Sequence, residues 1–206
     1  KMKRLKTKMW AMACLVVASM SLSSCLNGNN NSEEDWFGTP AERYQTFLTM
    51  KGNYAGKLYF PKGTDRDGKF ESDSIVSHWR IINDSTMEIY NVPPQALTTF
   101  VSDAALKTAI NTSAPMTLKC KVRFTKPQYK MFFAAPETKE QPIILNGTSH
   151  KVKFFAQQFT WDSRGLLQNS NTVMAQLVFT AIQLDGENNS KSSRIFPIVL
   201  KGQRMP

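Results

Sequence analysis

The stretch MTLKCKVRF, residues Met116–Phe124, decides the fold class. Apolar and polar residues alternate in it without a break: Met, Leu, Cys, Val and Phe occupy every second position, and Thr, Lys, Lys and Arg lie between them. Successive side chains of a β-strand point to opposite faces of a sheet. The alternation therefore predicts a strand with one buried face and one wet face.

Further strand-like runs lie on both sides of this stretch. They cover Asn53–Phe60, Phe70–Ile82, Thr86–Val92, Tyr129–Ala134, Ile143–Leu145, Ser149–Phe155, Thr172–Leu184 and Arg194–Lys201. Helical patterns are confined to a short segment opening at Thr39-Pro40-Ala41-Glu42, which has capping signals, and to an insertion between Pro94 and Ile110. Short turns such as Asn146-Gly147 separate the strands. We therefore predict a mainly β domain, an antiparallel β-barrel or β-sandwich with a short N-terminal helix and one helical insertion.

Residues 1–24 have the three parts of a bacterial export signal. A basic start precedes an apolar run from Met9 to about Leu22, which is shorter than the roughly 20 apolar residues of a membrane-spanning helix. Leu22-Ser23-Ser24-Cys25 resembles the lipobox of bacterial lipoproteins, which implies cleavage before Cys25 and acylation of that cysteine. We expect a lipoprotein signal peptide at 1–24, a lipidated Cys25 with a flexible acidic tether at 25–38, and a single β-rich domain at 39–206.

The start of the mature chain predicts a location. Ser32-Glu33-Glu34-Asp35 resembles the acidic surface-export signal of Bacteroidota lipoproteins, and a merely solvated linker is the alternative. Leu26, in place of an Asp directly after Cys25, fits sorting to the outer membrane. We expect a protein of the cell envelope that a lipid anchor holds at the outer membrane, in either the periplasmic or the surface leaflet.

The order of the predicted elements resembles lipocalin-like β-barrels, in which a short helix precedes a Gly-x-aromatic motif on the first strand. The motif here is Gly52-Asn53-Tyr54, with Tyr where lipocalins usually carry Trp. Taken whole, the chain resembles the uncharacterised outer-membrane lipoproteins of Bacteroidota that have a β-rich domain. This resemblance implies a membrane-attached β module and no particular reaction.

Charge and cysteine content exclude some functions. The chain has 26 Lys and Arg against 16 Asp and Glu, a net charge of +10. Five of the bases and none of the acids precede residue 25, so the remainder has 26 − 5 = 21 bases and a net charge of 21 − 16 = +5. Half of the basic excess thus belongs to the export signal, and export itself excludes nucleic acid as a partner. With Cys14 removed and Cys25 lipidated, Cys120 is left for the domain, and its place in the alternating strand predicts a buried, inert thiol.

The sequence offers no set of catalytic residues and no cofactor or metal site. The two histidines, His78 and His150, have no second ligand at a suitable spacing. The segment Asp65–Glu71 has some features of a calcium loop, but Gly63 and Ser74 stand where two key oxygen ligands belong, so a hairpin turn explains it better. An enzyme is unsupported.

Two groups of side chains remain as candidates for binding. The first is a series of basic residues that would bind an anionic glycan or lipid head group. The alternative is that these lysines only keep strand edges from pairing with other chains. The members of this basic series are Lys119, Lys121, Arg123, Lys126, Lys130, Lys151 and Lys153. The second is a set of aromatic residues in or beside strands, whose outward rings stack on sugars or pack on partners. Its members are Trp79, Trp161, Phe132-Phe133 and Phe154-Phe155.

These observations predict a lipid-anchored envelope lipoprotein that binds a small apolar or glycan ligand without catalysis. An accessory subunit that docks on a protein partner at the outer membrane is the alternative, and a hydrolase comes third. The ligand-binding residues are left unassigned.

Overall fold

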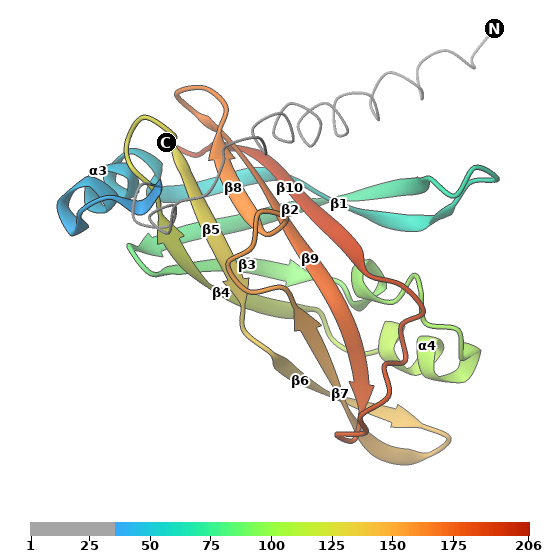
Figure 1. Cartoon of the computed structure of the whole chain (residues 1–206). Helices are drawn as coiled ribbons and strands as arrows, with labels where there is room; N and C mark the ends of the chain where they lie inside the picture. Colours follow the sequence, from blue (N-terminus) through green and yellow to red (C-terminus); the bar gives the residue numbers. More distant parts are fainter. Residues whose placement is uncertain (1–35) are drawn as a thin grey trace, which may run out of the picture. The chain divides into compact units, whose positions relative to one another are not determined.

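The computed structural model describes residues 36–206 (Figure 1). The predicted signal peptide, Cys25 and the tether up to residue 35 lie outside the described residues. The two helices are α3 (Pro40–Met50) and α4 (Ala104–Asn111), and a 3₁₀ turn, η1, covers Pro94–Leu97. The strands are β1 (Gly52–Thr64), β2 (Phe70–Asn83), β3 (Thr86–Val92), β4 (Met116–Phe124), β5 (Met131–Pro136), β6 (Lys139–Leu145), β7 (Thr148–Ala156), β8 (Arg164–Leu167), β9 (Thr172–Leu184) and β10 (Phe196–Arg204).

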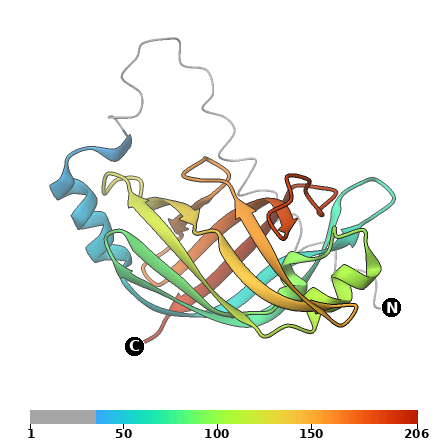
Figure 2. The same cartoon turned by 90° about the horizontal axis from the view of Figure 1, so that it is seen from below.

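Eight antiparallel strands close a β-barrel, in the order β10-β1-β2-β3-β4-β5-β8-β9, and β9 pairs back onto β10 (Figure 2). The first and last strands pair over their length, with Tyr54 opposite Arg204 and Tyr59 opposite Val199. The predicted mainly β, antiparallel fold is confirmed, and of the two architectures that the sequence left open the barrel is the one that forms.

The hairpin of β6 and β7 extends the barrel wall beyond β8. Strand β9 is long enough to pair with two strands on the same side. Its first half pairs with β8, from Leu167 opposite Val173, and its second half with β7, up to Val152 opposite Leu184. Strand β6 is the outer strand of this extension and carries Pro142, which lacks a backbone N–H and so protects the edge from pairing.

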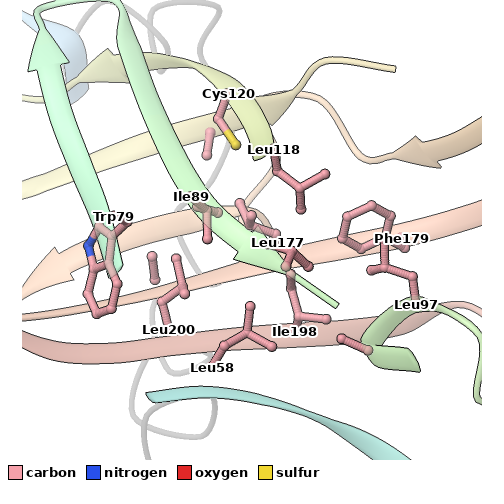
Figure 3. Packing of buried hydrophobic residues seen from close by; sticks show 14 of the residues in the cluster. Leu58, Trp79, Ile89, Leu97, Leu118, Cys120, Leu177, Phe179, Ile198 and Leu200 are labelled. Carbon is pink, nitrogen blue, oxygen red and sulfur yellow. The ribbon is translucent and has the colours of Figure 1, made fainter. Parts of the chain in front are cut away.

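The barrel interior is filled with apolar side chains (Figure 3). Tyr54, Leu58, Ile89, Leu177 and Leu200 expose no surface. A hollow that admitted water would leave accessible area on the side chains around it. These residues therefore form a packed core, and the calyx in which lipocalins hold a small apolar ligand does not lie among them.

Trp79 shows how tightly the interior is packed. Its indole stacks on Tyr54 with ring centroids 5.7 Å apart and reaches the backbone of Gly202, where an added Cβ would lie 2.4 Å from the ring. Gly202 faces Gly56 across the strand pair, and a Cβ on Gly56 would lie 2.2 Å from the carbonyl oxygen of Lys201. Glycine at these two positions thus lets the strands and the large ring approach.

Helix α3 begins as the sequence predicts, with a reciprocal cap. The Glu42 N–H donates to the Thr39 hydroxyl, and the Glu42 carboxylate accepts the Thr39 N–H at 2.7 Å. The helix packs on the barrel through Phe47 against Phe124, with ring centroids 5.7 Å apart. The predicted helix between Pro94 and Ile110 differs from the structure, which has η1 and α4 separated by an irregular segment. Asp103 begins α4 anew by accepting the Leu106 N–H at 3.0 Å.

Candidate functional site

A second apolar cluster lies on the outside of the barrel wall. On β5, Phe132 and Ala134 point inward to the core, so Met131 and Phe133 point outward. Met131 and Phe133 are only 5% and 4% exposed, although no strand covers them. The outer cluster joins them to Phe37, with partly buried Trp36, Tyr129 and Leu166 packed against it. The wall at β5 and β8 therefore carries an aromatic layer of its own.

Trp36 and Phe37, which we call the N-terminal segment, supply part of this layer. Phe37 packs on Phe133 with centroids 5.4 Å apart, and the Arg123 guanidinium lies 3.7 Å from the centre of the Phe37 ring. The Lys126 N–H donates to the Trp36 carbonyl at 3.0 Å and fixes the backbone. Trp36 and Phe37, which precede residue 39, thus belong to the packed domain, because both aromatic side chains pack against the wall.

The loop between β7 and β8, residues 157–163, presents two aromatic rings to solvent. Phe159 is 41% and Trp161 47% exposed. Phe159 has a φ of 53°, a left-handed conformation that is strained for a bulky residue and costs about 1–3 kcal/mol. Its N–H donates to the Ala134 carbonyl at 3.0 Å, and the buried Ser163 hydroxyl accepts the Val178 N–H at 3.1 Å. The loop is therefore held rigid with its rings outward.

The rings of the loop and of the N-terminal segment form a corner. Trp161 meets Trp36 nearly at right angles, 82°, with ring centroids 4.8 Å apart, and the centroid of the Tyr129 ring lies 4.3 Å from that of Trp36. The Arg164 guanidinium lies 4.9 Å from the Trp161 ring, and partial burial lowers the pKa of Arg164, which nevertheless stays protonated at neutral pH. We call Trp36, Tyr129, Phe159, Trp161 and Arg164 the outer aromatic site.

The structure separates the aromatic residues that the sequence grouped together. Trp161 faces outward, as a binding residue must, whereas Trp79 is 1% exposed and belongs to the core. Phe132 and Phe154 are also buried in the core, Phe133 lies beneath the outer aromatic site, and Phe155 is half-buried. Trp36 was not predicted as a site residue, because it follows an acidic stretch rich in glycine and asparagine that has no apolar period. The adjacent aromatic residues Trp36 and Phe37 were the one feature there that could have indicated packing on the domain.

The basic series does not form one stripe. Lys119, Lys121 and Arg123 are exposed on the outer face of β4, which has neighbours on both sides, so protection of a sheet edge does not explain them. In contrast, Lys151 and Lys153 of β7 lie 3.5 and 2.9 Å from the Glu140 carboxylate. The two remaining lysines, Lys126 and Lys130, lie in the turn between β4 and β5.

The titratable candidates have structural partners. Cys120 is fully buried, and this burial raises the pKa of its thiol well above the usual range, as expected for an inert thiol. His150 contacts the Asp185 carboxylate at 2.6 Å, and this hydrogen bond is the main cause of the lowered pKa of Asp185. His78 lies exposed on the outer face of β2.

Asp65, the first acid of the calcium-like segment, uses its carboxylate within the turn. It accepts the N–H groups of Asp67 and Lys69 at 3.0 and 2.8 Å, which is the arrangement of a hairpin turn. Among residues 36–206, no three His, Cys, Asp or Glu side chains gather as a metal site would require. Over the same residues no helix is both long and apolar enough to cross a bilayer.

Comparison with known proteins gives a family. No curated protein matches the chain. Among solved structures, an auxiliary nutrient binding protein from Bacteroides thetaiotaomicron aligns with 10% identity and a TM-score of 0.23, over 75% of this chain and 44% of its own length. The chain thus spans less than half of that protein. A family model described as a domain of unknown function, DUF4840, matches residues 49–184, from the end of α3 to the end of β9, and the chain belongs to this family.

Proposed function

We propose that this protein is an envelope lipoprotein, anchored by acyl chains on Cys25, that binds a glycan at the outer aromatic site without transforming it. The observation that carries the binding site is the loop 157–163, which holds Phe159 and Trp161 in solvent at a cost in backbone strain. Strain of this kind is retained where it positions functional groups.

The chemistry of the site supports a sugar as ligand. Exposed aromatic faces stack on the apolar C–H faces of a sugar ring, and the corner between Trp36 and Trp161 offers two rings at 82°. The Arg164 guanidinium beside them carries several N–H donors for hydroxyl oxygens. The packed core supports a ligand on the outer wall in preference to an apolar ligand inside the barrel.

Binding is favoured over hydrolysis by the acids of the loop. Glycoside hydrolases use two carboxyl groups that flank the scissile bond. The loop 157–163 contributes one carboxylate, Asp162, and it is exposed. A hydrolase therefore stays the weakest of the three predicted functions.

A protein partner is the second candidate. An open groove of about 500 Å³ lies between α4 and the turn of the β6–β7 hairpin. Ile144, which lines this groove, is 64% exposed. A partner that co-purifies in fixed ratio, and is lost in Ile144→Asp, would favour this accessory role.

The test of glycan binding uses the lipoprotein purified in detergent. Tryptophan fluorescence is followed while envelope and plant glycans are added, and Trp161→Ala is compared with Tyr44→Ala. Tyr44 is 48% exposed on α3, nearly the same fraction as Trp161, so it controls for loss of an exposed aromatic ring. We expect Trp161→Ala to weaken binding at least roughly tenfold, since stacking contributes about 1 kcal/mol or more per ring, and Tyr44→Ala to bind normally. A ligand that binds both variants equally well would overturn the site.

The anchor is tested separately by mass spectrometry of the N-terminal peptide of the protein isolated from its native host. We expect the mature chain to start at Cys25 with a diacylglycerol on the thiol, and Cys25→Ala to accumulate as an uncleaved precursor. An unmodified Cys25 in the mature chain would refute the anchor and leave the glycan site untouched.

A further inference from the structure

Five of the exposed cations lie on the outer faces of β10, β1, β2 and β4. With β3 between β2 and β4, these strands follow one another around the barrel wall (Figure 2). The five cations are Lys201, Lys57, Arg80, Lys119 and Lys121, and we call them the basic wall. Arg80, Lys119, Lys121 and Lys201 each lie between two buried residues of their strands, and Lys57 precedes the buried Leu58, so these side chains point outward. Three of the five, Lys57, Arg80 and Lys201, are absent from the predicted basic series, and strand pairing brings them to the same wall as Lys119 and Lys121.

The basic wall does not serve the stability of the sheet. Lys57 lies directly opposite Lys201, and like charges in this position destabilise a strand pair. Glu71 and Asp73 lie at the hairpin end of β2, beyond the part of β1 that pairs with β10. Glu88 is the one other carboxylate of these five strands, and it lies between Arg80 and Lys119 in the strand register. The strands are internal to the sheet, so edge protection does not account for the lysines either.

We infer that the basic wall docks on the phosphate head groups of a lipid bilayer. An array of cations is complementary to an anionic membrane surface, where each Lys or Arg strengthens binding roughly fivefold. Val76, which is 74% exposed and directly opposite Lys57, adds an apolar side chain beside these cations. Such a mixture of cations and apolar groups is typical of surfaces that lie on a membrane.

The position of the anchor is consistent with this contact, and this step alone rests on the proposed lipidation. Cys25 and Trp36 are 11 residues apart, which limits their separation to about 40 Å in a fully extended chain. A barrel held so close to the bilayer meets the head groups repeatedly, and the basic wall selects one orientation. In that orientation the outer aromatic site, on the neighbouring wall of β5 and β8, is left open to a ligand.

Lysine footprinting tests the contact within one molecule. The acylated protein is reconstituted on vesicles of phosphatidylcholine with or without phosphatidylglycerol, treated briefly with an amine-acetylating reagent and analysed by mass spectrometry. We expect acetylation of Lys57, Lys119, Lys121 and Lys201 to slow by roughly tenfold on the anionic vesicles, and high salt to restore it. Lys62 and Lys69, exposed on the β1–β2 hairpin, serve as internal controls that keep their rates.

A pair of charge-matched variants separates position from net charge. Lys57→Gln/Lys201→Gln and Lys151→Gln/Lys153→Gln remove the same charge from different sides of the domain. We expect the first variant to lose the protection of Lys119 and Lys121, by roughly fivefold in the docking equilibrium per cation removed, and the second to keep it.

Three results would overturn the inference. They are equal rates on both vesicle types, slowing of Lys62 and Lys69 to the same extent, and protection of the basic wall by a soluble acidic polysaccharide but not by phosphatidylglycerol. If Cys25 proves unmodified, the same footprint on protein added to preformed vesicles still tests the wall, so its failure is distinguishable from failure of the anchor or of the glycan site.

Discussion

Replacing Phe37 with Ala should release the N-terminal segment from the barrel without unfolding the barrel. Phe37 is 8% exposed, packs on Phe133 with the two rings tilted by 54°, and lies under the Arg123 guanidinium. Burial of a Phe side chain contributes about 1.5–3 kcal/mol. The ring pair adds about 0.5–1.5 kcal/mol, and the cation about 0.5–1 kcal/mol. A loss of about 3 kcal/mol, near the lower end of the sum, makes the released state roughly 100-fold more populated.

Hydrogen exchange measures this release at one amide. The Lys126 N–H donates to the Trp36 carbonyl, so it exchanges when the segment leaves. The N–H of Val122, a buried residue of β4, donates instead to the carbonyl of Ser85 in the β2–β3 turn. We expect exchange of Lys126 to accelerate roughly 100-fold in Phe37→Ala, with Val122 unchanged and nearly the same melting temperature.

Phe70→Ala on the β1–β2 hairpin is the matched control, because it removes a partly buried ring that packs on Phe100 elsewhere in the domain. It should leave exchange at Lys126 as in the wild type. Unchanged protection of Lys126 in Phe37→Ala would refute the reasoning, and so would equal acceleration at Val122, which would mean that the segment and the barrel open together.

Three further outcomes are expected. Because burial raises the pKa of the Cys120 thiol, iodoacetamide should label it only in denaturant, and labelling of the native protein in mass spectra would contradict the buried position. The hydrogen bond from His150 lowers the pKa of Asp185 below 3.8 in the folded protein. The ionised Asp185 carboxylate therefore stabilises the fold above pH 3.8, and this stabilisation is lost as the pH falls through the pKa that Asp185 has in the folded protein. Urea midpoints from pH 6 to 3 should therefore fall less steeply in Asp185→Asn than in the wild type. Leu58→Ala, at a position with no exposed surface, should cost about 2–5 kcal/mol in urea unfolding, and a much smaller cost would indicate a loosely packed interior.

Local patterning predicted most of the elements, because the alternation in Met116–Phe124 is a property of neighbouring residues. In the structure this stretch is β4, with its apolar side chains buried and its lysines exposed. The short β8 was missed, since Arg164–Leu167 is too brief to show a period and includes Gly165. Closure of the barrel could not be read locally either. It depends on pairs such as Tyr54 and Arg204, which strand pairing brings together from the two ends of the domain.

The candidate site was predictable only in part. Trp161 was among the predicted aromatic residues, but its sequence surroundings did not distinguish it from Trp79, because both lie in or beside strands and exposure depends on what covers each face. Trp36 completes the site through contacts with Tyr129 and Trp161, which are distant in sequence. The basic wall has the same origin: the pairing of β10, β1, β2, β3 and β4 brings together lysines from three separate segments and Arg80 from a fourth.

The indole N–H signals of the protein test the central claim most directly, since the three tryptophans after residue 25 report on two different places. Trp36 and Trp161 belong to the outer aromatic site, and Trp79 lies in the core. When a glycan identified by titration is added, the account predicts that the NMR signals of Trp36 and Trp161 shift while that of Trp79 stays in place. A shift confined to Trp79 would place the ligand inside the barrel and contradict the account.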